Sequence, residues 1–263
     1  MGAGTAGSLS FRAMQLGFIG AGNMASALAR GWGEPVLCTD SGSGRAAALA
    51  QELGGEALAS NRELAERVDV VVLAHKPAQL AAIAGEIDGA AKAVVSIVGG
   101  VSQAELRAAY PDTTVLRVSP NTPAAVGKGV FVFAVPDAPV DEQLHAAVRE
   151  RFARLGTIVD VPEPLVGVAG ASSGVAPAYW ALIVEAWVDA ALRRGLPVAT
   201  ANELVIGAME GTVELLRSYD GDTLAVRRAV TSPGGSTARG LAALERGGVR
   251  AAIAQAMDDV VGA

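Results

Sequence analysis

The chain has 263 residues, of which 51% are hydrophobic, so it can bury the core of one large or two moderate domains. Its formal net charge of −6 gives no overall basic field, which argues against nucleic acid or an anionic membrane as a partner. A single cysteine excludes an internal disulfide, and one cysteine with only two histidines argues against a zinc cluster. We expect a small soluble ligand and a reducing cytoplasm.

The chain opens with a segment that carries no fold signal, followed by a strand, a glycine turn and a helix. Residues 1–14 are rich in Gly, Ala and Ser and lack the apolar core of a secretion signal, so we expect a disordered lead-in. Short apolar runs at residues 16–19 and 36–39 predict two strands, and residues 24–32 between them have helical spacing. The folded part is therefore expected to begin at Gln15.

Strand and helix patterns alternate up to about residue 161. Ser60 and Ser102 each stand three residues before a glutamate, the spacing of a capping box at a helix start. Apolar runs predict further strands at residues 70–74, 94–98 and 115–118. This alternation predicts an α/β domain over residues 15–161, with a Rossmann-like, doubly wound parallel sheet that binds ligands at the carboxyl ends of its strands. The loops expected at those ends are residues 20–23, 74–77, 99–100 and 119–123.

The pattern changes at residue 162, because no further strand signal follows. Apolar helices are predicted at residues 178–194, 199–217, 224–230, 237–246 and 249–261. We expect an all-helical second domain over residues 162–263. The apolar stretch at residues 175–191 contains Glu185 and Asp189 and is short for a membrane span, so it predicts a buried helix. Its nearly uniform apolar surface predicts that this domain forms a dimer interface.

The turn Gly20-Ala21-Gly22-Asn23-Met24-Ala25 follows the first strand and opens the first helix. It fits the pattern G-x-G-x-x-A, in which the first glycine allows a tight turn and the second lets the backbone approach a pyrophosphate. The helix N-terminus then faces the phosphates. This context predicts a dinucleotide site.

The residues after the second strand leave the choice of dinucleotide open. Asp40 stands twenty residues after Gly20, where a carboxylate accepts hydrogen bonds from an adenosine ribose and favours NAD. Ser41, Ser43 and Arg45 follow at once, and they could hold the 2′-phosphate of NADP if Asp40 points away. Asp40 could also simply cap the turn through its side chain.

A second glycine-rich loop, Ser232-Pro233-Gly234-Gly235-Ser236-Thr237, precedes a predicted helix near the C-terminus. Its hydroxyl groups and backbone N–H groups predict an anion cradle made of neutral groups. The chain thus offers two anion sites on separate segments, one for a cofactor and one for a substrate.

The distribution of lysine and histidine limits the chemistry. The three lysines are Lys76, Lys92 and Lys128, so the helical domain has none, and a dehydrogenase that needs a lysine there for proton transfer loses its key group. His145 lies on a predicted surface helix, and His75 ends a strand where it could touch a cofactor. A hydride transfer to an already protonated imine needs no strong protein acid and suits these residues.

Several motifs together resemble the pyrroline-5-carboxylate reductase family over nearly the whole chain after Met14. The most specific is the run of residues 231–237, Thr-Ser-Pro-Gly-Gly-Ser-Thr. The others are residues 17–25, Lys76-Pro77, Pro120-Asn121-Thr122-Pro123, Pro177-Ala178-Tyr179 and Gly195-Leu196-Pro197.

The resemblance implies a reaction and a substrate site. Hydride would pass from C4 of a reduced nicotinamide to C5 of L-1-pyrroline-5-carboxylate, giving L-proline, the product of the last step of proline biosynthesis. Thr237 would hydrogen-bond the ring nitrogen, and Ser232 would help to hold the carboxylate. The backbone N–H groups implied in carboxylate binding belong to Gly234, Gly235 and Ser236, and Glu163 would border the pocket.

The resemblance also implies a cofactor site and an assembly. It favours NADPH slightly, whereas Asp40 argues for NADH. Asn61 would lie at the adenosine ribose, while residues 74–77, residues 98–100 and Asn121 would line the nicotinamide half. The full set of expected cofactor-binding residues is Gly20, Gly22, Asn23, Met24, Asp40, Ser41, Arg45, Asn61, Ala74, His75, Lys76, Pro77, Val98, Gly99, Gly100 and Asn121. Subunits of the family pair through their C-terminal helices, often as dimers within a decamer.

One departure from the family pattern bears on the substrate. Where the family usually reads Ser-Gly-Ser-Gly-Pro-Ala-Tyr, this chain has Val175 and Ala176 in place of the second serine and glycine. These residues either reshape the pocket for another cyclic imine, such as a six-membered piperideine carboxylate, or face the core without effect, and we favour the second reading slightly. A non-catalytic dinucleotide-binding protein is the other alternative, against which the intact Ser232 and Thr237 argue.

Overall fold

The structure is a computed structural model that describes residues 14–262, so most of the expected lead-in lies outside the described residues. Met14 packs against the hydrophobic core. By internal contacts the chain divides into two units, Met1–Gly174 and Val175–Ala263. The helix at Val166–Gly174 follows the expected boundary at residue 161 but packs on a strand of the first unit. The boundary stays a prediction.

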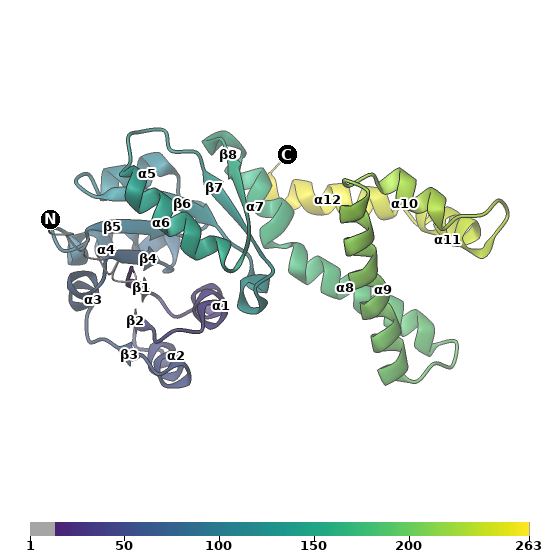
Figure 1. The fold of residues 1–263 in the computed structure, drawn as a ribbon, viewed down its shortest axis with the longest axis horizontal. Helices are drawn as coiled ribbons and strands as arrows, with labels where there is room; N and C mark the ends of the chain where they lie inside the picture. Colours follow the sequence, from purple (N-terminus) through teal and green to yellow (C-terminus); the bar gives the residue numbers. More distant parts are fainter. Residues whose placement is uncertain (1–13, 263) are drawn as a thin grey trace, which may run out of the picture. The chain divides into compact units, whose positions relative to one another are not determined.

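An eight-stranded sheet forms the centre of the first unit, in the order β3-β2-β1-β4-β5-β6-β7-β8 (Figure 1). Its strands are β1 (Leu16–Ile19), β2 (Leu37–Thr39), β3 (Glu56–Ala57), β4 (Val70–Leu73), β5 (Ala93–Ser96), β6 (Thr114–Ser119), β7 (Gly129–Ala134) and β8 (Gly156–Val161). Neighbours run parallel except β6 and β7, which are antiparallel. The predicted Rossmann-like doubly wound sheet is confirmed, and β3, β7 and β8 extend it beyond the predicted strands.

Helices cover both faces of this sheet. They are α1 (Asn23–Trp32), α2 (Arg45–Leu53), α3 (Asn61–Arg67), α4 (Leu80–Ile87), α5 (Gln103–Ala109), α6 (Glu142–Ala153) and α7 (Val166–Gly174). Short 3-10 turns follow three strands: η1 (Pro77–Gln79), η2 (Thr122–Val126) and η3 (Glu163–Leu165). The predicted caps form, since the hydroxyls of Ser60 and Ser102 accept from the N–H groups three residues on at 3.1 and 3.2 Å.

Alternate residues of the central strands enter two separate apolar layers, as the pleat of a strand requires. Phe18 and Val72 belong to the cluster that packs under α1, α2 and α6. Ile19 and Val71 belong to the cluster under α3, α4 and α5. The central strands are therefore apolar on both faces, which explains their continuous hydrophobic runs.

An aromatic group fixes β7 against the helices. The ring of Phe152 on α6 meets the rings of Trp32, Phe131 and Phe133 edge-on, at centroid distances of 5.4, 5.2 and 5.5 Å. Edge-to-face contacts of this kind add to the free energy of simple burial. They connect α1 and α6 with β7, the strand that runs antiparallel to β6. The apolar layer under α1, α2 and α6 therefore extends over β7.

The second unit consists of helices alone. They are α8 (Ala176–Leu192), α9 (Val198–Ser218), α10 (Thr223–Ala229), α11 (Ser236–Arg246) and α12 (Val249–Val261), close to the predicted ranges. Within the single chain only Val188, Ala201 and Val226 of the described residues after Gly174 are buried. The expectation of a buried helix at residues 175–191 is therefore not met in one chain, where Leu182 and Trp187 are 64% and 61% exposed.

One helical run among the described residues, Glu163–Leu192, is long and apolar enough to cross a membrane by length and composition, with a mean hydropathy of 1.3. Those two properties are shared by helices that a second protein chain covers.

The packing of α1 on η2 leaves no room for a side chain at Gly31. A Cβ atom there would lie 2.2 Å from the carbonyl oxygen of Ala124. We expect Gly31→Ala to lower the free energy of unfolding by about 1 to 3 kcal/mol, the usual cost of overpacking, as measured by urea denaturation of the whole chain. Gly85→Ala on α4 is the matched control, because a Cβ atom there meets nothing within 4 Å. It should raise stability by about 0.5 to 1 kcal/mol, and a loss at Gly85 equal to that at Gly31 would contradict the argument.

Candidate dinucleotide and substrate sites

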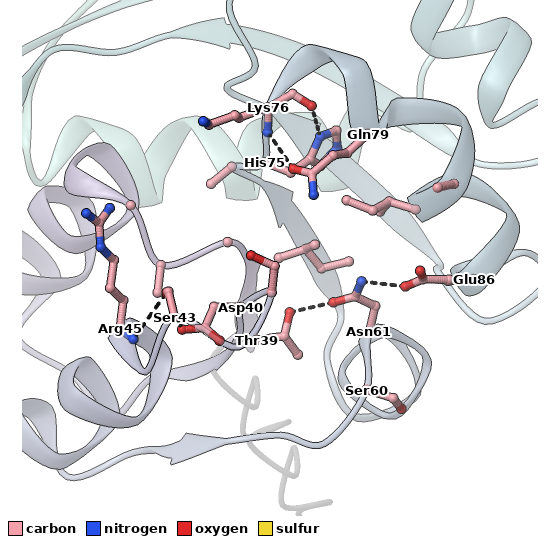
Figure 2. Close-up of a pocket in the computed structure, with 18 of the residues that line it drawn as sticks. Thr39, Asp40, Ser43, Arg45, Ser60, Asn61, His75, Lys76, Gln79 and Glu86 are labelled. Carbon is pink, nitrogen blue, oxygen red and sulfur yellow. Dashed lines mark hydrogen bonds between the residues drawn. The ribbon is translucent and has the colours of Figure 1, made fainter.

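A cavity of about 580 Å³ opens at the carboxyl ends of β1, β2 and β4 (Figure 2). This is the point where the strand order reverses between β1 and β4, the place where open α/β sheets bind ligands. The expected cofactor residues that line it are Gly20, Gly22, Asp40, Ser41, Arg45, Asn61, Ala74, His75 and Lys76. Ser43, which could hold a 2′-phosphate, lines the cavity too, and lining residues that were not expected include Thr39, Ser60, Gln79, Ala82, Ile83 and Glu86.

The glycine turn has the geometry that its motif predicts. Gly20 has φ +103°, and a Cβ atom there would lie 2.6 Å from the carbonyl oxygen of Ala74, so only glycine fits. At Gly22, in contrast, a Cβ atom would meet no protein atom within 4 Å. Gly22 is also the N-cap of α1 and provides no side-chain acceptor, so the first N–H groups of the helix are available to an anion. These features fit a pyrophosphate.

Asp40 caps the loop that follows β2. Its carboxylate accepts hydrogen bonds from the N–H groups of Gly42 and Ala46 at 2.8 and 2.9 Å, and from the Ser43 hydroxyl at 2.8 Å. The bond from Ala46, with the smaller contributions of Ser43 and Gly42, lowers the pKa of the Asp40 carboxyl. Both carboxylate oxygens are thus engaged within the loop, which corresponds to the turn-capping alternative.

A chain of hydrogen bonds crosses the opposite wall of the cavity. The Thr39 hydroxyl donates to Oδ1 of Asn61 at 2.5 Å, and Nδ2 of Asn61 donates to Oε2 of Glu86 at 2.6 Å. Figure 2 shows the three side chains following one another along this wall. Thr39 and Glu86 are 47 residues apart in the chain, and no local spacing links them.

His75 lines the cavity and uses one of its ring nitrogens in a local hydrogen bond. Its Nδ1 lies 2.9 Å from the carbonyl oxygen of Lys76, which can only accept, so Nδ1 carries the proton. Nε2 is buried and has no hydrogen-bond partner among residues 14–262. Burial lowers the pKa of His75, which disfavours the imidazolium. In the neutral ring, which burial favours, Nδ1 donates to Lys76 and Nε2 is the acceptor.

The remaining expected cofactor residues do not line this cavity. Asn23 and Met24 form the first turn of α1, Pro77 begins η1, and Val98, Gly99 and Gly100 follow β5. Asn121 acts as a clamp, because its Oδ1 accepts from the N–H of Val130 at 2.8 Å and its Nδ2 donates to the carbonyl of Ser173 at 3.1 Å. It joins β7 to α7 from a position that is 6% exposed. Contact of these residues with a cofactor stays a prediction.

Glu163, expected at the substrate pocket, is held within the first unit. Its carboxylate accepts from the backbone N–H and from Nε2 of Gln103, both at 3.0 Å, and pairs with Arg117. The Arg117 side chain is 14% exposed and Gln103 is 3% exposed. This network fixes η3, and hence the start of α7, to α5 and β6. Its role toward a substrate stays a prediction.

The loop before α11 has the shape of an anion cradle. Gly234 has φ +69°, and Gly235 lies so close to Ser232 that a Cβ atom would be 2.4 Å from the Ser232 hydroxyl oxygen. The N–H of Gly235 already donates to the carbonyl of Ser232 at 3.0 Å. Among the described residues, the N–H groups of Gly234 and Ser236 have no partner, and α11 has no side-chain cap.

An arginine that the sequence reasoning missed stands beside this cradle. Nη1 of Arg239 donates to the carbonyl oxygen of Gly234 at 2.7 Å. The contact holds the Gly234 peptide and brings a positive charge close to the loop. The position of Arg239, in the first turns of α11 and facing back along the helix, is the signal that could have revealed it.

The strand order, the glycine turn and the cavity define a dinucleotide-binding domain of the Rossmann type, joined to a helical unit that carries a neutral anion cradle. The family model described as pyrroline-5-carboxylate reductase dimerisation matches residues 163–262. The model described as NADP oxidoreductase, coenzyme F420-dependent, matches residues 15–100.

Relatives of known name cover almost the whole chain. A pyrroline-5-carboxylate reductase of Synechocystis is 36% identical, over 93% of this chain and 94% of the relative. The enzyme of the same name from Escherichia coli is 33% identical, over 92% and 94%. The chain belongs to the pyrroline-5-carboxylate reductase family, as its motifs predict.

Solved structures agree with this assignment. The 1-pyrroline-5-carboxylate reductase of Streptococcus pyogenes matches with a TM-score of 0.87 and 28% identity, over 94% of this chain and 96% of that chain. The pyrroline carboxylate reductase of Plasmodium falciparum with NADP bound matches with a TM-score of 0.85 and 29% identity, over 94% and 95%.

The engagement of Glu163 allows a test of its role. We expect Glu163→Gln to lower the free energy of unfolding by about 1 to 3 kcal/mol, because the half-buried Arg117 and Gln103 lose charge-assisted partners. Asp137→Asn is the control, since Asp137 forms an exposed pair with Arg107 and should change stability by less than about 0.5 kcal/mol. Unchanged stability with a raised KM for the imine would instead show that Glu163 acts on the substrate.

Proposed function

We propose that the protein reduces L-1-pyrroline-5-carboxylate to L-proline with NAD(P)H, the final step of proline biosynthesis. The main support is that the sequence similarity spans whole enzymes and includes both binding features. The chain covers 94% of two relatives named pyrroline-5-carboxylate reductase and keeps both a dinucleotide cavity and a neutral anion cradle. The cradle suits a substrate that has a carboxylate and needs no strong protein acid.

The residues of the cradle would act by positioning. When bound, the reduced nicotinamide supplies the hydride that adds to C5 of the imine, while the electron pair of the C=N bond moves to nitrogen. The hydroxyl of Ser232 and the free N–H groups of Gly234 and Ser236 hold the carboxylate, and Thr237 hydrogen-bonds the ring nitrogen. Gly235 can join them only by releasing the carbonyl of Ser232. A protonated imine needs no lysine, and the chain has none after Lys128.

The activity can be tested directly by following the loss of nicotinamide absorbance when the imine is added with NADPH or NADH. Oxidation of either cofactor that depends on the imine supports the proposal, and no absorbance loss with either would refute it. Val175 and Ala176 justify including a six-membered piperideine carboxylate, because they replace a hydroxyl and a glycine at the start of α8. The higher kcat/KM identifies the ring that the site prefers.

Thr237 provides the test of the catalytic arrangement. Thr237→Ala should lower kcat by about 10- to 100-fold, on the scale of removing one oriented hydrogen-bonding group. Circular dichroism and the melting temperature should not change, since Thr237 is only partly buried and its hydroxyl makes no hydrogen bond within the described residues. Ser218→Ala removes an exposed hydroxyl on α9 and should leave turnover unaltered. Equal turnover of wild type and Thr237→Ala would exclude this residue from the mechanism.

We propose NADPH as the preferred cofactor, and the loop after β2 supports this choice. Asp40 is engaged within the loop, while Ser41, Ser43 and Arg45 line the cavity, and Arg45 forms no ion pair with any residue between 14 and 262. A guanidinium with nearby hydroxyls binds a phosphate through charge-assisted bonds. The resemblance to an NADP-bound structure points the same way.

Arg45→Met should therefore raise the KM for NADPH by about tenfold and leave the KM for NADH nearly unchanged, because only NADPH has the 2′-phosphate. Arg62→Met is the control, since Arg62 pairs with Glu66 on α3 and does not line the cavity. An equal rise for both cofactors would show that Arg45 does not read the phosphate.

The assembly and location follow from the same proposal. The exposed helices of the second unit and the match to a dimerisation model support a homodimer through the C-terminal helices, and we propose dimers within a decamer. The partners are a cyclic imino acid and further copies of this chain, with no role for nucleic acid or membrane, and the location is the cytoplasm.

A further inference from the structure

One wall of the dinucleotide cavity contains a hydrogen-bonded relay that the proposed reaction does not use. It consists of Thr39 at the end of β2, Asn61 at the start of α3 and Glu86 on α4. The bonds are short, at 2.5 Å from Thr39 to Asn61 and 2.6 Å from Asn61 to Glu86. All three side chains line the cavity.

The chemistry of Glu86 fixes the orientation of the Asn61 amide. An ionised carboxylate can only accept hydrogen bonds, so the Asn61 nitrogen must face Glu86 and its oxygen must face Thr39. The Thr39 residue is 3% exposed, and its hydroxyl has no partner other than Asn61 among the described residues. A flipped amide would set its oxygen against the carboxylate. The relay therefore has one polarity.

This polarity leaves two groups for a ligand. Nδ2 of Asn61 has two hydrogens, and Glu86 takes one of them, so one N–H remains. Oε1 of Glu86 has no hydrogen-bond partner between residues 14 and 262. A donor and an anionic acceptor side by side match a hydroxyl group, which can accept from the first and donate to the second. A phosphate, which cannot donate when fully ionised, would be repelled by Glu86.

The position of the relay indicates which hydroxyl it would meet. In a Rossmann-type domain the adenosine ribose lies at the end of the second strand, where Thr39 stands. The loop with Ser43 and Arg45 occupies the 2′ side in the proposed function, on the wall of the cavity away from Glu86 (Figure 2). The hydroxyl left for the relay is the 3′-hydroxyl, which NADH and NADPH share.

We propose that Glu86 is a cofactor-positioning residue. Together with Thr39 it locks the Asn61 amide so that Asn61 donates to the 3′-hydroxyl of the adenosine ribose, and Glu86 accepts from the same hydroxyl. The inference rests on the proposed function for the identity of the ligand. It differs from the role of Arg45, because it acts equally on NADH and NADPH.

Binding of the dinucleotide to the full chain, measured by calorimetry without imine, tests the proposal. Glu86→Gln keeps the shape of the side chain but can both donate and accept, so the amide of Asn61 loses its fixed orientation. We expect the Kd to rise about tenfold for NADH and NADPH alike. Glu66→Gln, at an exposed glutamate of α3 outside the cavity, should leave both values unchanged. An unchanged Kd for Glu86→Gln would overturn the proposal.

A dinucleotide that lacks the 3′-hydroxyl separates direct contact from structural support. Wild type should bind it about tenfold more weakly than the natural cofactor, whereas Glu86→Gln should show little further loss, because the contact is already gone. A full tenfold loss in Glu86→Gln as well would show that Glu86 does not meet this hydroxyl.

A swapped pair distinguishes support of the fold from binding. Asn61→Asp combined with Glu86→Gln forms the hydrogen bond between the two side chains with reversed polarity and keeps an acceptor for Thr39. The melting temperature of this double variant should therefore equal that of wild type. The double variant has no N–H group for the ligand at position 61, so its Kd for the dinucleotide should stay as high as that of Glu86→Gln alone. Recovery of the Kd together with the melting temperature would make the relay purely structural.

These measurements are independent of the proposed reaction. A wild type that binds NADPH but does not reduce the imine would refute the reaction and leave the relay to be judged by its own variants. A wild type that binds no dinucleotide would overturn both.

Discussion

Apolar surface that one chain cannot cover is the constraint on which the rest of this structure depends. Of the described residues in the second unit, which begins at Val175, only three are buried within the chain. Large apolar side chains such as Leu182 and Trp187 are mostly exposed. Burial of such groups is the main favourable contribution to folding, so a helical unit of this kind gains its stability from association with another chain. The match of residues 163–262 to a dimerisation model agrees with this argument.

The first unit differs from the second, because it buries its own hydrophobic core within a single chain. Its central strands are covered on both faces, and the rings around Phe152 fasten the added strand β7 to α1 and α6. On this frame the cavity takes its form from backbone contacts that admit no substitution, such as Gly20 against Ala74. Recognition is left to side chains on the loops and helix starts, where Asp40 shapes one wall and the relay through Asn61 shapes the other.

The sequence predicts best what depends on neighbouring residues. The glycine turn, the capping serines and the strands β1, β2, β4, β5 and β6 follow from local spacing, and the helices of the second unit follow from periodicity. The two-residue strand β3 was not predicted. The run Val130-Phe131-Val132-Phe133 had the composition of a strand, yet β7 was missed, and so was the antiparallel step that it introduces. Glu86 was missed for a different reason, because its link to Asn61 exists only once α3 and α4 lie side by side. Asp40 shows the limit of motif reasoning, since capping a turn and binding a ribose need the same residue at the same place.

The division of the chain has a consequence for how the protein behaves on dilution. The cavity belongs entirely to the unit with its own core, whereas the cradle before α11 belongs to the unit that lacks one. In the proposed function the dinucleotide would therefore bind to each chain by itself. In the proposed function turnover also needs the cradle, and of the described residues in its unit only Val188, Ala201 and Val226 are buried within one chain. Specific activity would accordingly depend on the concentration of the enzyme itself, and a cell could set its proline output through the amount of protein that it maintains as well as through the supply of substrate.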